Sequence, residues 1–177
     1  MPLNAEGRAQ AARLAARLAV DPHDALFSSD LARARQTAAP LAAAWQRSAM
    51  PLTGLREQNF GVLEGLTAEA IEAQHPVLWQ RWLEADADFE PPGGESQRRF
   101  HARVLNAVRE LAAQAGSQRL AVVTHGGVLD MLWRSAHGLP LAGHRECDIP
   151  NTGLNRLRWA GGTLHVDHWA DDAHLFD

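Results

Sequence analysis

Apolar residues recur at two different spacings along the chain, and the change of spacing separates predicted helices from predicted strands. Near the start, apolar side chains recur every three or four residues, at Ala11, Leu14, Ala15 and Leu18. This spacing predicts an amphipathic helix, and Asn4 is suited to cap its first turn. By the same argument, with Thr67 and Ser96 as further caps, the sequence predicts helices at about 31–45, 68–75, 78–83, 97–115 and 128–137.

Shorter apolar runs between these helices predict strands, at 25–27, 52–56 and 120–123. The last of these runs, Leu-Ala-Val-Val, contains no polar residue, which is typical of a strand covered on both faces. Near the end of the chain, two alternating segments flank Gly161-Gly162 and predict a hairpin of 154–159 and 164–169.

The order of these elements predicts the fold class. Helices alternate with single strands up to about residue 137, and a hairpin follows. We therefore expect an α/β protein, a three-layer α/β/α sandwich with a mostly parallel sheet and a C-terminal hairpin. No linker-like segment or internal repeat divides the chain, so we expect residues 1–177 to form a single domain.

Charge and composition narrow the possible functions. The 177 residues carry 17 basic and 21 acidic side chains, a net charge of −4, so the chain lacks the basic excess that nucleic-acid binding requires. All the basic residues are arginines, which excludes Schiff-base chemistry and a P-loop lysine. Cys147 is the single cysteine, and no apolar run approaches the ~18 residues of a membrane helix. We therefore expect a protein of the reducing cytoplasm, without nucleic-acid or membrane partners.

Polar clusters follow each of the three predicted sheet strands, at 28–35, 56–61 and 124–127. Ligands of open α/β sheets bind at the carboxyl ends of the strands, so we expect Arg33, Glu57 and His125 to converge. An arginine beside the amides of a helix start suits a phosphate group. A glutamate there can donate a proton, and a histidine can act as a charge clamp or a base.

Each candidate also has a plainer interpretation. Arg33 near a helix start is compatible with an ordinary surface residue, and Glu64 competes with Glu57 for the role of acid. His165 and His168 are candidate metal ligands. Residues three apart on a strand point to opposite faces, however, so we expect no metal site there and no bound metal. The sequence contains neither Gly-x-Ser-x-Gly nor Gly-x-Gly-x-x-Gly, which argues against a serine hydrolase and a dinucleotide-binding fold.

Five segments together resemble the histidine phosphatase superfamily, also called phosphoglycerate mutase-like. They occur in the family's order, at 3–11, 28–38, 55–65, 92–96 and 122–127. The resemblance implies a three-layer fold, a metal-free phosphate pocket that uses no cofactor, and a phosphohistidine intermediate. It also implies a small phosphorylated metabolite as the ligand.

The resemblance further implies a role for each candidate residue. By motif position, Arg33 binds the phosphoryl group and Arg35 assists it. Glu57 is the proton donor, and His125 stabilises the transferring phosphoryl group together with the amides near Gly126.

One motif of that family has no counterpart in this sequence. The family opens with a strand ending in Arg-His-Gly-Glu, whose histidine is the nucleophile, and residues 1–177 contain no Arg-His-Gly. We therefore expect an N-terminally truncated domain that lacks its first strand and nucleophile and is inactive as given. The short segment between Gly65 and Pro92 favours a phosphatase over a mutase for the intact form.

A missing central strand would leave neighbouring strands with unpaired edges. We therefore expect the chain to be marginally stable or to associate, for example as a homodimer. The alternative function is a non-catalytic module that binds phosphorylated ligands or only self-associates.

Overall fold

Three short parallel strands form the larger sheet of the computed structural model, which describes residues 1–116 and 118–176. The strands are β1 (Ala25–Ser28), β2 (Ala49–Pro51) and β3 (Leu120–Val123), in the order β2-β1-β3. Leu26 of β1 is in register with Ala49 on one side and Ala121 on the other. The sequence-based expectation of an α/β fold with a parallel sheet is confirmed.

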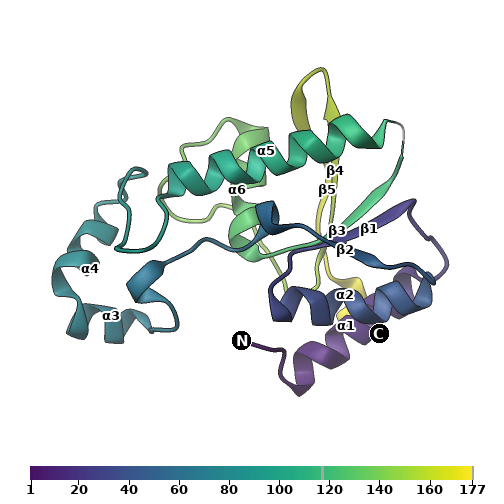
Figure 1. The fold of residues 1–177 in the computed structure, drawn as a ribbon, viewed down its shortest axis with the longest axis horizontal. Coiled ribbons are helices and arrows are strands. Elements are labelled where there is room, and N and C mark those ends of the chain that lie inside the picture. Colours follow the sequence, from purple (N-terminus) through teal and green to yellow (C-terminus); the bar gives the residue numbers. More distant parts are fainter. Residues whose placement is uncertain (117, 177) are drawn as a thin grey trace.

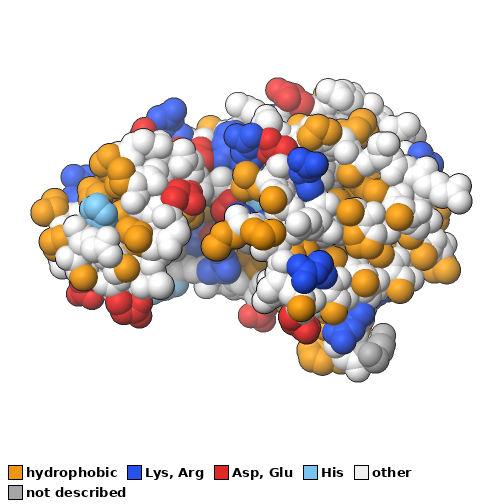
Figure 2. Space-filling model, turned by 60° about the horizontal axis from the view of Figure 1, so that its bottom comes forward, with side chains coloured by type: hydrophobic (Ala, Val, Ile, Leu, Met, Phe, Trp, Pro, Cys, Tyr) orange, Lys and Arg blue, Asp and Glu red, His pale blue; other side chains and the backbone are white. Residues whose placement is uncertain are grey.

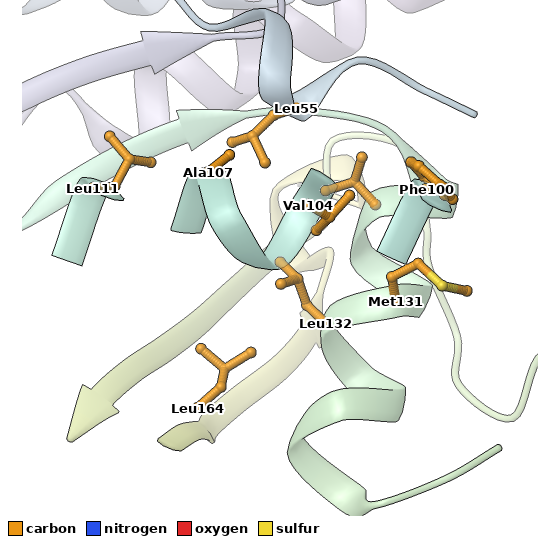
Figure 3. Close-up of a cluster of buried hydrophobic side chains, with 9 residues drawn as sticks. Leu55, Phe100, Val104, Ala107, Leu111, Met131, Leu132 and Leu164 are labelled. Carbon is orange, nitrogen blue, oxygen red and sulfur yellow. The ribbon is translucent and has the colours of Figure 1, made fainter. Parts of the chain in front are cut away.

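Helices lie on both faces of this sheet (Figure 1). On one face lie α1 (Ala5–Leu18) and α2 (Ala32–Ala44), and on the other lie α5 (Gln97–Ala115) and α6 (Gly126–His137). Alternation along β1 explains the two layers, because successive side chains of a strand point to opposite faces. Leu26 packs with Ala15, Leu41 and Trp45 on the α1–α2 side. Phe27 packs against the α5–α6 side, whose buried cluster is drawn in Figure 3.

Side-chain caps begin three of the helices where the sequence predicted them. Asn4 Oδ1 accepts from the Gly7 amide at the start of α1, at 2.8 Å. Thr67 and Ser96 accept from the amides three residues on, at the starts of α3 (Ala68–Gln74) and α5. Each cap satisfies an amide that has no partner inside its helix. A further short helix, α4 (Pro76–Leu83), follows α3, and the two lie at the end of the molecule away from the hairpin (Figure 1).

The predicted C-terminal hairpin is also confirmed. Strands β4 (Leu154–Ala160) and β5 (Thr163–Asp171) pair antiparallel around Gly161 and Gly162, whose φ angles are 59° and 79°. Two central residues with positive φ suit a tight hairpin turn, and glycine adopts them without strain. Leu164 of β5 is 6 % exposed and belongs to the α5–α6 cluster (Figure 3). After the hairpin, a 3₁₀ turn at Ala173–Leu175 packs on α1.

The prediction of a strand at 52–56 is wrong. The strand lies earlier, at β2, and Thr53–Leu55 form a 3₁₀ turn. The carbonyls of Gly54 and Arg56 accept hydrogen bonds from Arg103 Nη1 of α5, at 3.0 Å each, rather than joining the sheet. A methyl group at Gly54 would lie only 2.7 Å from Ala107 Cβ, so α5 packs directly on this turn.

The expectation that 120–123 is covered on both faces is also wrong. No residue of β3 is fully buried, and Val122 is 37 % exposed. Among the described residues, β3 pairs only with β1, so it lies at an edge of the sheet. An apolar run therefore identified the strand here but not its depth in the molecule.

Candidate phosphate site

The candidate site is built around His125, which lies two residues after the end of β3 and is the N-cap residue of α6. His125 is 6 % exposed. Nδ1 accepts from Arg33 Nε at 3.2 Å, and Nε2 lies 2.7 Å from Ser29 Oγ. Because Nδ1 accepts, the ring proton belongs on Nε2, which donates to the hydroxyl of Ser29. The end of β1, the start of α2 and the end of β3 thus meet at one imidazole.

The environment of His125 keeps the ring neutral. Burial, followed by the positive charges of Arg33 and Arg103, lowers the pKa of His125 from 6.5 to about 4. In the free protein this side chain is therefore a neutral hydrogen-bond donor at pH 7. The sequence suggested that His125 acts as a positively charged ligand for an anion. That role would require a bound anion to raise the pKa of His125.

Glu57 lies against the first turn of α6. Its Oε2 accepts from the Gly127 amide at 3.1 Å, and its Oε1 accepts from the Gln58 amide at 2.9 Å. A carboxylate is favoured at this end of a helix by the helix dipole. Glu64, the competing candidate for the acid, accepts from the Phe60 amide at 2.9 Å and caps its own loop. The structure thus places Glu57, and not Glu64, against the helix that His125 begins.

Arg103 is a contributor to this site that sequence reasoning missed. Its Nη1 donates to the carbonyls of Gly54 and Arg56, and its Nη2 donates to the carbonyl of Glu57 at 3.3 Å. Arg103 also forms an ion pair with Glu95. Glu95 Oε1 in turn accepts from the Asn59 amide, at 3.0 Å. The pair therefore fastens the segment on both sides of Glu57. The resemblance included Glu95, but no local signal connects Arg103, two helical turns further on, with a loop some 46 residues earlier.

The structure brings four of the five predicted site residues together. Arg33, Glu57, His125 and Gly126 surround the first turn of α6, where Gly126 is the first helical residue. Arg35 is exposed and makes no hydrogen bond or ion pair with these residues within the described chain. It lines a separate cavity of about 320 Å³ together with Ser28, Asp30, Ala39, Ala49 and Pro51. The predicted assisting role of Arg35 stays a prediction.

Comparison with known proteins decides the family. The family model of the histidine phosphatase superfamily (branch 1) matches residues 1–172. The chain belongs to this superfamily. Phosphoglycerate mutase-like protein 4 of Arabidopsis thaliana is 33 % identical over 98 % of this chain and 76 % of its own length. The glucosyl-3-phosphoglycerate phosphatase of Mycolicibacterium vanbaalenii is 34 % identical over 96 % of this chain and 83 % of its own.

A solved structure agrees with this assignment. The chain superposes on Bacillus stearothermophilus YhfR with a TM-score of 0.88 and 28 % identity, covering 98 % of this chain and 87 % of the other. The three-layer expectation and the resemblance stated from sequence motifs are thereby confirmed. Relatives of this chain include both phosphatases and mutase-like proteins.

Two features are absent from the described residues. No group of three or more His, Cys, Asp or Glu side chains in the described ranges is arranged to hold a metal ion. No helix within those ranges is long and apolar enough to cross a membrane.

Proposed function

We propose that the site around His125 binds the phosphoryl group of a small phosphate monoester. The observation that carries this proposal is the contact between Arg33 Nε and His125 Nδ1, at 3.2 Å. This contact uses one edge of the guanidinium, and its two terminal nitrogens make no hydrogen bond to any described residue. Those nitrogens form the planar fork that suits two oxygens of a phosphate. The first-turn amide of Gly126 supplies a further donor to the same group.

The remaining residues support phosphoryl transfer as the chemistry of the intact site. A histidine nitrogen would attack phosphorus, the bond from phosphorus to the ester oxygen would break, and Glu57 would give its proton to the departing alcohol. Water would then attack the phosphohistidine and release inorganic phosphate. Arg33 and His125 would stabilise the charge on the transferring group, which is the main task of a protein in such reactions.

The nucleophile is the part of this scheme that residues 1–177 do not supply, because they contain no Arg-His-Gly. His125 is held between Arg33 and Ser29, which suits stabilisation rather than attack. We therefore propose that this chain by itself binds phosphate esters without hydrolysing them. The named phosphatase among its relatives favours hydrolysis over mutase chemistry for an intact site.

The test combines turnover with binding on the chain as given. Turnover of p-nitrophenyl phosphate is expected to equal the blank, whereas inorganic phosphate is expected to bind in a calorimetric titration. Arg33→Ala should abolish this binding, and Arg109→Ala should leave it unchanged, because the Arg109 side chain hydrogen-bonds only Asn106 among the described residues. If the parent chain hydrolyses p-nitrophenyl phosphate and the His125→Ala variant does not, the proposal that this chain lacks a nucleophile is wrong. Phosphate binding that survives Arg33→Ala would contradict the site itself.

One observation favours a second candidate, self-association. β3 lies at an edge of the sheet among the described residues, and its Val122 is 37 % exposed. Unpaired edges of this kind pair with other strands unless something protects them. Sedimentation velocity over a concentration series tests the idea, and Val122→Lys should shift the distribution towards monomer. A monomer at every concentration would exclude a homodimer.

A further inference from the structure

A cavity of about 320 Å³ lies apart from the residues around His125. It is bounded by α2, by β2 and by the end of β1, and its walls are Ser28, Asp30, Arg35, Ala39, Ala49 and Pro51. Neither Arg33 nor Glu57 nor His125 lines it. Its volume lies within the range of small-molecule sites in proteins, about 300–1,000 Å³. The cavity is therefore large enough to hold a small organic ligand.

Two polar wall residues are held in place by contacts of their own. Ser28 is 1 % exposed; its Oγ donates to the carbonyl of Ser29 and its carbonyl accepts from the Leu52 amide, each at 2.8 Å. Asp30 accepts from Arg56 on both of its oxygens, with Nε 2.6 Å from Oδ1. The shape of this side of the cavity is thus fixed before a ligand enters, and the charge of its carboxylate is already balanced.

Arg35 brings an unbalanced positive charge to the cavity. Its side chain is exposed and makes no hydrogen bond or ion pair within the described chain. Its charge nevertheless reaches the cavity wall, because it helps to lower the pKa of Asp30, after the larger effect of the hydrogen bond from Arg56. A guanidinium with free terminal nitrogens can donate two parallel hydrogen bonds to one carboxylate. The cavity therefore favours a ligand that carries one negative charge.

The remaining walls of the cavity are apolar. Ala39 lies four residues after Arg35, on the same face of α2, and Ala49 and Pro51 belong to β2. Figure 2 faces the α1–α2 side of the molecule and shows single basic side chains (blue) set among apolar ones (orange). One guanidinium beside small apolar side chains suits a carboxylate with an apolar body. A phosphate dianion, by contrast, requires more donors than this cavity offers.

We propose that this cavity is a second ligand site, which binds a small organic acid through its carboxylate. The carboxylate pairs with Arg35, and the apolar body of the acid packs against the three apolar wall residues. The second site is independent of the proposed phosphate site, because the two have no side chain in common. Both nevertheless use the segment 28–35, so the test below distinguishes one from the other.

The test uses benzoate as the probe and benzamide, an uncharged molecule of nearly the same shape, as the reference. The isotope-labelled chain as given is titrated with each, and its backbone amides are followed by NMR. Benzoate is expected to bind more tightly than benzamide and to shift the amides of the wall residues, those of Ser28, Asp30, Arg35, Ala39 and Ala49.

Arg35→Gln removes the charge that the proposal requires. Because Arg35 is exposed, the variant should fold as the parent chain does, and it should bind benzoate about fivefold more weakly, the scale of one partly exposed ion pair. Its binding of benzamide should not change. Arg109→Gln is the matched control, since α5 lies on the other face of the sheet from α2, and it should change the binding of neither probe.

A second variant tests the apolar side of the cavity without a change of charge. Ala39→Leu places a larger side chain at an exposed helical position, where leucine is a good helix former, so the variant should fold. It should reduce the binding of benzoate because it fills space that the ring would occupy.

Four outcomes would overturn the inference. They are no shift with benzoate at high millimolar concentration, equal binding of benzoate and benzamide, unchanged benzoate binding in Arg35→Gln, and shifts centred on Gly126 that inorganic phosphate reverses. The last outcome would place benzoate in the phosphate site. Failure of the parent chain to bind inorganic phosphate would contradict only the proposed function, because the cavity uses none of that site's side chains.

Discussion

The carboxylate of Glu57 occupies the space that a side chain at Gly127 would fill. A methyl group at Gly127 would lie 2.1 Å from Glu57 Oε1, and the amide of the same glycine donates to Oε2. The absence of a side chain at this position thus lets a loop carboxylate lie directly on a helix turn. The relationship links the two halves of the candidate site, since Glu57 follows β2 and Gly127 follows β3.

The first prediction concerns this contact. Gly127→Ala should displace the Glu57 carboxylate and cost both of its amide hydrogen bonds, lowering the free energy of unfolding by about 1–3 kcal/mol in urea titrations. In a Glu57→Ala background the same substitution should cost clearly less, because the obstructing carboxylate is gone. Equal costs in the two backgrounds would show that the carboxylate does not lie there.

The second prediction concerns the protonation of His125. Burial beside Arg33 places its pKa at about 4, so an NMR titration should find the ring neutral at pH 6. Inorganic phosphate should raise the pKa of His125, because a bound anion favours the imidazolium. A ring that titrates near 6.5 in the free protein would contradict the contact with Arg33.

The same pKa has a consequence for stability. The unfolded chain takes up a proton at His125 near pH 6.5, whereas the folded chain does so near pH 4. The free energy of unfolding should therefore fall as the pH is lowered through this interval. Burial also lowers the pKa of His101, which acts in the same direction. His125→Gln should reduce the slope of the free energy of unfolding against pH between 6.5 and 4, and His101→Gln should reduce it further.

The third prediction concerns the attachment of the C-terminal hairpin to α1. The guanidinium of Arg17 hydrogen-bonds Asp171 and lowers the pKa of that carboxyl to about 2. The ion pair stabilises the folded chain fully above the usual carboxyl pKa of about 3.8, and this stabilisation is lost as the pH falls towards 2. The loss therefore occurs at lower pH than the loss of stability caused by His125. Because both groups are partly exposed, Asp171→Asn should lower the free energy of unfolding at pH 7 by only ~1 kcal/mol. Asp167→Asn, on the exposed face of the same strand, is the control.

The fourth prediction concerns Arg103 and the loop that carries Glu57. Arg103→Met removes the donors to the carbonyls of Gly54, Arg56 and Glu57 and leaves Glu95 without its ion pair. Hydrogen exchange at the amides of Gln58 and Asn59 should therefore accelerate, while exchange in β1 stays slow. Arg98→Met, which loses only an exposed pair with Asp88, should accelerate neither. Unchanged exchange at Gln58 in Arg103→Met would show that the loop does not depend on this arginine.

Local chemistry in the sequence was enough to predict most of the elements. The caps at Asn4, Thr67 and Ser96 act within one helical turn, and the hairpin turn at Gly161-Gly162 needs only two residues with positive φ, so neighbours along the chain decide both. The motifs also placed Arg33 and His125 in the segments that follow two adjacent parallel strands, where the two side chains meet. The prediction of a strand at 52–56 was wrong because Arg103, on the distant helix α5, donates hydrogen bonds to carbonyls of this segment.

The sequence by itself determined the α/β class, the helix caps and the family, because each depends on residue types at short or characteristic spacing. The tertiary structure decided which glutamate faces the site, since only packing against Gly127 distinguishes Glu57 from Glu64. It also decided the neutral state of His125, because burial and the charge of Arg33 set that pKa. Contacts of this kind join residues far apart in the chain, and no local spacing encodes them.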